Sequence, residues 1–94
     1  MRRRCVITGM GAVTPCGNTV DEFWNNIKNG VSGIDFITKF DTTDYKVKVA
    51  GEVKNFDPEL YVTKKDVKRN DMYSIYAIAA AQQAYDMSGI KEDE

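Results

Sequence analysis

The stretch VITGMGAVTPCGNT, residues 6–19, has the residue types and spacing of a phosphate-binding loop. Gly9 and Gly11 form a Gly-x-Gly directly after an apolar run, and Gly17 precedes two polar residues. Loops of this kind hold phosphate groups with backbone N–H groups and with the N-terminus of the following helix. The stretch therefore raises the question of whether this protein binds a nucleotide.

Both phosphate-loop patterns fail at the residues that would touch phosphate. The dinucleotide pattern G-x-G-x-x-G/A has Thr14 at its sixth position, and the first helix signal comes only at Thr19. The ATP pattern G-x-x-x-x-G-K-[ST] has five residues instead of four between Gly11 and Gly17, and Asn18 takes the place of its lysine. We therefore expect no nucleotide or other cofactor here, with a nucleotide-binding oxidoreductase as an alternative.

Two cysteines, Cys5 and Cys16, are too few for a disulfide framework or a metal cluster. Cys5 lies inside the first apolar run, and we expect it to be a small buried hydrophobic residue. Cys16 lies in the loop, where a nucleophile is conceivable, but the chain has no histidine to activate a thiol. We assign no catalytic residue and no metal ligand to this chain.

A run of basic side chains is the second candidate site. At about 100° per residue, its members fall within an arc of about 140° on a helix. Such a face is either solvated or suited to dock an acidic partner. The candidate residues are Lys64, Lys65, Lys68 and Arg69, whereas we expect the three arginines at residues 2–4 to be solvated flanking charge.

Composition limits the chain to one small globular domain. It has 94 residues, 43% hydrophobic and 29% charged, and its net charge of −1 argues against general nucleic-acid binding. The basic start resembles a signal peptide, but glycine, threonine and proline interrupt any apolar run of about 7–15 residues. No segment approaches the ~20 apolar residues that cross a bilayer. We expect a cytoplasmic protein that binds neither membrane nor nucleic acid.

The N-terminal part of the chain predicts a strand followed by a helix. Residues 4–9 are short and β-branched without alternation, which is typical of a strand buried on both faces of a parallel sheet. Thr19-x-x-Glu22 is a capping box that opens an amphipathic helix, and Gly30 ends it. We expect Trp24 on the apolar stripe of this helix to lie in the core.

The middle of the chain shows no helical period. Residues 31–56 are expected to be irregular, with a turn at 41–44 and a short, partly exposed strand within 46–53. Residues 57–59, Asp-Pro-Glu, are an N-cap with proline at the first helical position and predict a short helical turn. Thr63 can cap the basic run as a second turn.

A long helix is predicted from Asn70 or Asp71 to Ser88, with Gly89 as its stop. Only four polar residues interrupt residues 72–87, so the helix is apolar around most of its circumference. We expect its tyrosines to be core residues. The rest of the chain cannot cover this helix on all sides, and we infer an N-terminal piece of a larger protein or a chain that needs others.

Residues 2–24, RRRCVITGMGAVTPCGNTVDEFW, resemble the N-terminus of the elongating β-ketoacyl-acyl-carrier-protein synthases, the condensing enzymes of fatty acid synthesis. That family opens with a basic-R-V-V-I-T-G-x-G-x-[VL]-[ST]-P-x-G-N pattern, followed by a helix that contains tryptophan. The likeness continues through FDTTDY, AGEVKNFDPE and the basic run, and it covers essentially the whole chain. The pairing of FDTTDY with AGEVKNFDPE is similar to the type II enzymes.

The resemblance implies an α/β fold in which residues 1–94 are the N-terminal segment of a β-ketoacyl synthase N-terminal domain. They would form the start of a thiolase-like five-layer α-β-α-β-α fold, and the glycine loop would be a scaffold that binds no nucleotide. The family reaction is a decarboxylating Claisen condensation of acyl groups with malonyl-carrier protein. A cysteine takes the acyl group and two histidines assist decarboxylation. This chain lacks histidine and the nucleophile motif, so the catalytic residues would lie outside it.

The resemblance also implies partners. The basic run at Lys64, Lys65, Lys68 and Arg69 would dock the acidic acyl carrier protein, acyl and malonyl thioesters would be substrates, and the full-length protein would be a homodimer. Two alternatives stay open: a polyketide-type ketosynthase, and a non-enzymatic module that binds an acidic partner through Lys64–Arg69.

Overall fold

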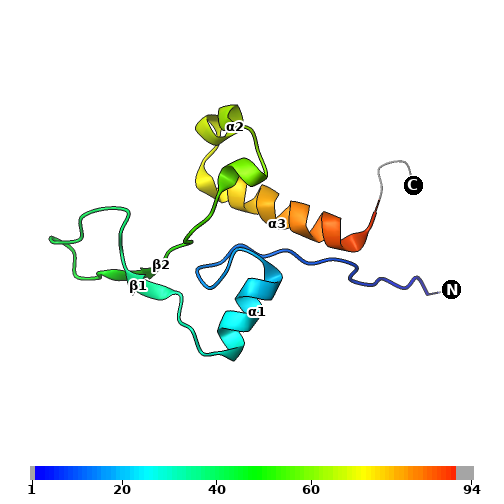
Figure 1. The fold of residues 1–94 in the computed structure, drawn as a ribbon, viewed down its shortest axis with the longest axis horizontal. Helices are drawn as coiled ribbons and strands as arrows, with labels where there is room; N and C mark the ends of the chain where they lie inside the picture. Colours follow the sequence, from blue (N-terminus) through cyan, green and yellow to red (C-terminus); the bar gives the residue numbers. More distant parts are fainter. Residues whose placement is uncertain (1, 91–94) are drawn as a thin grey trace. The chain divides into compact units, whose positions relative to one another are not determined.

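A computed structural model describes residues 2–90, which divide into two compact units (Figure 1). One unit is residues 13–56, and the other combines residues 2–12 with residues 57–90. The first unit contains α1 (Val20–Lys28), β1 (Ile34–Phe36) and β2 (Val49–Gly51). The second contains the 3-10 helix η1 (Pro58–Leu60), α2 (Lys64–Arg69) and α3 (Met72–Ser88).

Helix α1 begins and ends where the sequence predicts. The Thr19 hydroxyl accepts a hydrogen bond from the Glu22 backbone N–H at 3.2 Å, and Gly30 takes a left-handed φ of +70°. The expectation for Trp24 is wrong, because its side chain is 56% exposed. The Lys28 Nζ lies 6.0 Å from its ring centroid, so the indole packs under a charged side chain rather than in a core.

Strands β1 and β2 form a two-stranded antiparallel sheet. Ile34 lies opposite Gly51, and Phe36 lies opposite Val49. The strand expected within residues 46–53 is confirmed as β2, but the expectation that residues 31–56 are otherwise irregular misses β1. Three residues are too few to show an alternating pattern, and β1 is defined by its pairing with β2 rather than by its own sequence.

Helix α3 carries the core of the second unit. Asp71 occupies its N-cap position without a side-chain hydrogen bond, and Gly89 follows its last residue with a φ of +73°, which agrees with the predicted bounds. Ile75 and Ala79 are fully buried, whereas the helix also presents exposed apolar side chains: Met72, Tyr73, Ile78, Tyr85 and Met87. Residues 2–90 therefore do not cover α3 on all sides, as expected. Tyr73 and Tyr85 are corrected from core to exposed, at 74% and 42%.

The predicted first strand is not formed. Residues 4–9 have no regular structure, and Cys5, Val6 and Ile7 are exposed, so the expectation of a buried Cys5 is wrong as well. A strand needs a hydrogen-bonding neighbour, and no strand among residues 2–90 pairs with this segment. Within the described residues 2–90, strands β1 and β2 pair only with each other.

None of the helices described across residues 2–90 has both the length and the apolar character needed to cross a bilayer.

Candidate functional site

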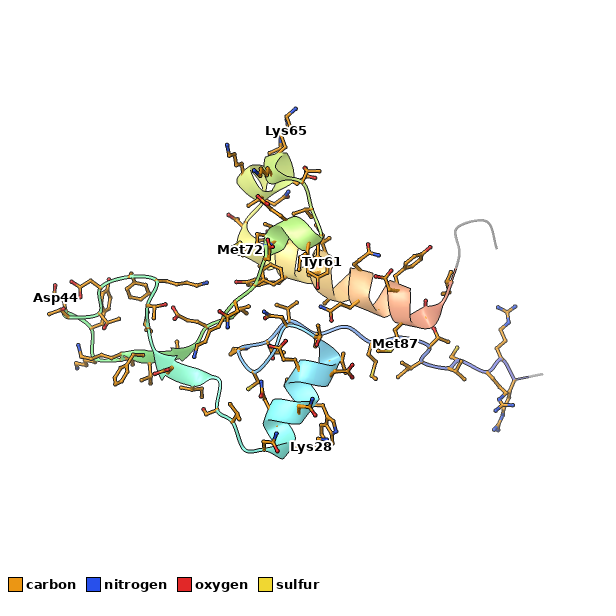
Figure 2. All side chains as sticks on the ribbon, viewed as in Figure 1. Lys28, Asp44, Tyr61, Lys65, Met72 and Met87 are labelled. Atoms are coloured by element: carbon orange, nitrogen blue, oxygen red, sulfur yellow. The ribbon has the colours of Figure 1, made fainter. Side chains whose placement is uncertain are left out.

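The basic run forms α2, and its four charged side chains are exposed as the helical arc predicts. Thr63 caps the first turn, with its hydroxyl accepting from the Asp66 N–H at 3.3 Å. Figure 2 shows Lys65 projecting outward from this helix. The structure thus brings Lys64, Lys65, Lys68 and Arg69 together on one short element.

The opposite side of α2 is partly buried. Asp66 and Val67 have intermediate exposure, and they lie outside the arc of the four basic residues. The salt bridge seen among the described residues joins Lys54 to Asp35 at 3.7 Å, so no described carboxylate forms a salt bridge with the basic side chains of α2. A surface of this kind offers unpaired positive charge to an incoming anionic partner.

The Gly-x-Gly of residues 9–11 packs against α3. A Cβ at Gly9 would lie 3.0 Å from the Ala84 carbonyl carbon, and one at Gly11 would lie 2.7 Å from the Ala80 carbonyl carbon. Both positions would also press directly on the carbonyl oxygens of those residues. These glycines are needed because the two backbones approach too closely for any side chain.

Backbone N–H groups along this stretch are already used within the protein. The Met10 N–H points to the Met87 sulfur at 3.4 Å, and the Ala12 N–H donates to the Gln83 Oε1 at 3.0 Å. Hydrogen bonds that hold the later turn use the N–H groups of Thr14, Cys16 and Gly17. A phosphate cradle needs such N–H groups free and converging, so this geometry favours the scaffold interpretation.

The loop at residues 14–17 is a closed turn of the first unit. Thr14 and Gly17 exchange backbone hydrogen bonds of 2.8 and 3.1 Å, and the Asn26 amide donates to the Cys16 carbonyl. A Cβ at Gly17 would lie 2.5 Å from the Phe23 nitrogen, so α1 also packs against this turn. The turn therefore positions the start of α1.

Cys16 lines a small depression of about 200 Å3 beside this turn. Its thiol is half-buried and lies 4.0 Å from the Val31 carbonyl oxygen. The other lining residues are Pro15, Gly17, Glu22, Asn26, Val31, Ser32, Lys54 and Asn55. No imidazole is available from a sequence without histidine, so the surroundings supply no partner of the kind that activates cysteine nucleophiles. No group of His, Cys, Asp or Glu within residues 2–90 is arranged to hold a metal ion.

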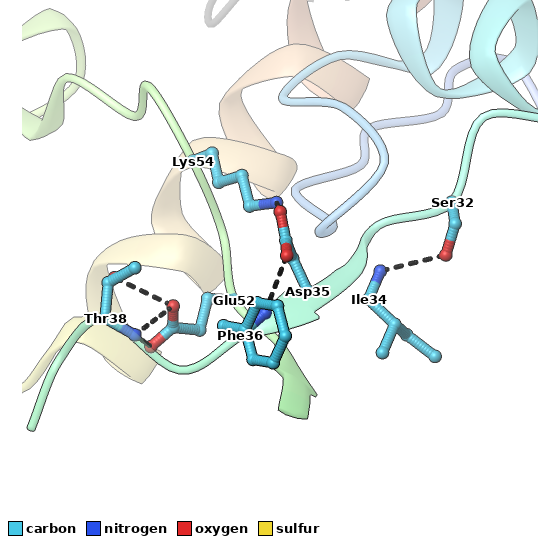
Figure 3. Close-up of polar contacts among 7 residues, drawn as sticks. All are labelled: Ser32, Ile34, Asp35, Phe36, Thr38, Glu52 and Lys54. Carbon is cyan, nitrogen blue, oxygen red and sulfur yellow. Dashed lines mark hydrogen bonds and ion pairs between the residues drawn. The ribbon is translucent and has the colours of Figure 1, made fainter. Parts of the chain in front are cut away.

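The Glu52 carboxylate ties together the ends of β1 and β2 (Figure 3). It accepts hydrogen bonds from the Thr38 N–H at 3.1 Å, the Thr38 hydroxyl at 2.9 Å and the Lys39 N–H at 3.2 Å. These bonds, the Thr38 N–H first among them, lower the pKa of Glu52 below its ordinary value of 4.5. The carboxylate has a structural role here.

The polar turn expected at residues 41–44 is also present. Asp41 Oδ1 accepts from the Thr43 hydroxyl at 2.6 Å and from the Thr43 N–H at 3.0 Å. Of these two bonds, the one from the hydroxyl contributes more to lowering the pKa of Asp41 below its ordinary value of 3.8.

Comparison with known sequences decides the family. The family model described as the β-ketoacyl synthase N-terminal domain matches residues 2–94. The chain belongs to this family.

Two curated relatives of this ketoacyl synthase chain carry the name 3-oxoacyl-[acyl-carrier-protein] synthase 2. The protein from Staphylococcus aureus strain COL is 51% identical over 82 residues, which are 87% of this chain and 20% of that protein. The protein from Vibrio cholerae is 46% identical over 93 residues, which are 99% of this chain and 22% of that protein. The chain thus spans about a fifth of the length of these relatives.

A solved structure described as the ishigamide ketosynthase/chain length factor matches the fold of this ketoacyl synthase chain. The TM-score is 0.88 at 35% sequence identity, and the match covers 99% of this chain and 23% of that one. This likeness supports the thiolase-like α/β fold class that the sequence resemblance implies.

Two polar residues near the candidate sites were missed at the sequence level. Gln83 accepts from the Ala12 N–H and donates to the Tyr61 hydroxyl at 3.3 Å, which links the glycine segment to the residues after η1. Asn70 donates through its side chain to the Asp66 carbonyl at 2.9 Å and closes α2. Asn70 could have been found from its place just after the basic run, whereas nothing in the sequence marks the partners of Gln83.

Proposed function

We propose that this chain is the N-terminal segment of a β-ketoacyl synthase N-terminal domain in a type II-like 3-oxoacyl-[acyl-carrier-protein] synthase. The whole enzyme, a cytoplasmic homodimer with the five-layer α-β-α-β-α arrangement, elongates acyl chains in fatty acid synthesis. The observation that carries this proposal is the 51% identity to a protein of that name. The match to the Vibrio cholerae protein, 46% identical along 99% of the chain, includes both the glycine stretch and the basic run.

The reaction is a decarboxylating Claisen condensation. An acyl group passes from a carrier thioester to an enzyme cysteine, and the carrier thiol leaves. The malonyl thioester then loses CO2, and the resulting carbanion attacks the acyl carbonyl carbon and expels the cysteine thiolate. The product is a 3-oxoacyl thioester on the carrier. Residues 1–94 supply neither the cysteine nor the histidines of these steps, because they contain no histidine and lack the family's nucleophile motif.

This segment instead contributes a docking surface for the carrier protein, namely the exposed side chains of Lys64, Lys65, Lys68 and Arg69. Each exposed ion pair is worth only about 0.2–1 kcal/mol, so single substitutions should have small effects. The combined field of several charges steers an acidic partner and raises its association rate more than its affinity.

The test is charge reversal in the whole enzyme. Changing Lys65, Lys68 and Arg69 to glutamate should raise the apparent KM for carrier-bound substrate, while a small acyl thioester without the carrier is used as before. Raising the salt concentration should reduce the difference in KM between this variant and the parent enzyme, because exposed charges are screened over about 8–10 Å at physiological ionic strength.

The matched control is reversal of Arg2, Arg3 and Arg4, which are also exposed and carry the same number of positive charges. This variant should keep a normal KM for the carrier-bound substrate. If the α2 variant loses activity equally with both substrates, the basic run is structural. If it keeps full activity with both substrates, the basic face of α2 is only solvated and the docking proposal fails.

A polyketide-type ketosynthase is the second candidate, favoured by the fold match to the ishigamide ketosynthase/chain length factor. The two candidates are separated by complementation. A bacterial strain that depends on its own 3-oxoacyl-[acyl-carrier-protein] synthase 2 should regain normal fatty acids from the whole enzyme if the first proposal holds. Failure to restore them, with the protein expressed and folded, would favour the polyketide alternative.

A further inference from the structure

Helix α2 is held by two side-chain caps that meet at one residue. The Thr63 hydroxyl accepts from the Asp66 N–H at 3.3 Å. At the other end, the Asn70 side-chain amide and the Asn70 backbone N–H both donate to the Asp66 carbonyl, at 2.9 and 3.1 Å. Six residues are far below the ~12–15 that an isolated helix needs, so α2 depends on such local support.

The capping hydrogen bonds do not involve the basic side chains. Asp66 lies about 60° outside the arc of the four basic residues at about 100° per residue. Its partial burial contrasts with the exposure of all four. Thr63 and Asn70 can therefore keep the helix wound while the charged groups stay available to a partner.

We infer that Thr63 and Asn70 are positioning residues of the carrier-docking surface: they keep α2 helical before the carrier protein arrives. This inference rests on the proposed docking function. A frayed α2 would spread its charges over many directions, and only the fraction of molecules with a wound helix would bind productively. Apparent affinity falls in proportion to that fraction, so the caps set affinity without adding any contact.

The expected effect is a change in KM for one class of substrate. Removing a cap typically shifts a helix equilibrium about five-fold. In the whole enzyme, Thr63→Val and Asn70→Ala should each raise the KM for acyl-carrier protein thioester by up to about that factor, which is reached when the frayed form of α2 predominates in the variant. The kcat, and the KM for a pantetheine thioester that lacks the carrier, should stay unchanged. Thr63→Ser keeps the hydroxyl and should restore the parent value.

Helix α1 offers a matched control. Thr19 caps it with the same geometry, its hydroxyl accepting from the Glu22 N–H at 3.2 Å, but α1 carries no basic cluster. Thr19→Val should leave the carrier KM unchanged. Amide exchange of residues 64–70 gives a second readout that does not need activity, and it should quicken in Thr63→Val and Asn70→Ala but not in Thr19→Val.

The outcomes distinguish failure of this inference from failure of the docking proposal on which it rests. If α2 exchanges faster in the cap variants while their carrier KM is normal, the caps do not position the site. The inference would also be overturned if the cap variants were impaired equally with the carrier-bound and the pantetheine substrate, or if Thr19→Val raised the carrier KM as much as they do. If reversal of Lys65, Lys68 and Arg69 has no effect on the carrier KM, the docking proposal falls, and the role of Thr63 and Asn70 falls with it.

Discussion

Substitution of Gly11 by alanine should detach residues 2–12 from α3. The new Cβ would lie 2.7 Å from the Ala80 carbonyl carbon and 3.0 Å from the Gln83 Cβ. Comfortable contacts between carbon atoms lie at about 3.5–4.0 Å, so the segment must retreat by about 1 Å. The obstructing atoms include helix backbone, which cannot turn aside as a side chain does.

The cost has two parts. Overpacking of this kind costs about 1–3 kcal/mol. The retreat also stretches the 3.0 Å hydrogen bond from the Ala12 N–H to Gln83, whose loss costs about 0.5–1.5 kcal/mol. We therefore expect Gly11→Ala to destabilise the unit by roughly 2–4 kcal/mol.

Gly89→Ala is the matched control in the same unit. A Cβ there meets nothing within 4 Å, but its φ of +73° is unfavourable for alanine. The cost should be limited to about 1–2 kcal/mol for the left-handed conformation. The assays are urea unfolding and hydrogen exchange read by mass spectrometry on peptides that cover residues 6–13. If Gly11→Ala keeps both the stability and the exchange protection of Ala12, the close approach to α3 is not what requires glycine.

Three further outcomes are expected. Glu52 has a lowered pKa in the fold, so its contribution to stability is complete above pH 4.5 and is lost as the pH falls below that value. Glu52→Gln should therefore reduce the dependence of stability on pH in this range of the acid unfolding curve. An unchanged curve would contradict the role of the Thr38 hydrogen bonds. The isolated chain should gain no acyl group from acyl-carrier protein, and a stoichiometric adduct on Cys5 or Cys16 in the intact mass would refute this. Because α3 exposes apolar side chains, the isolated chain should self-associate in sedimentation measurements, whereas a compact monomer with a concentration-independent melt would show otherwise.

The sequence alone determined where the helices begin and end. Thr19 and Thr63 cap α1 and α2, and Gly30 and Gly89 follow α1 and α3 with positive φ, all as predicted. Caps depend on hydrogen bonds and backbone angles within a few residues, so the local sequence contains everything that decides them. The basic face of α2 was predictable for the same reason, because helical spacing alone places its charges on one side.

Only the tertiary structure decided what lies against what. Residues 4–9 have the composition of a buried strand, yet a strand exists only where a neighbour pairs with it, and β1 exists because β2 does. Trp24 fits an apolar stripe, but burial depends on what covers the stripe. The glycines of residues 9–11 show the clearest division. Their spacing suggests a phosphate-binding loop. In the structure, however, the backbone of α3, which is far away in sequence, fills the space that side chains at these positions would need.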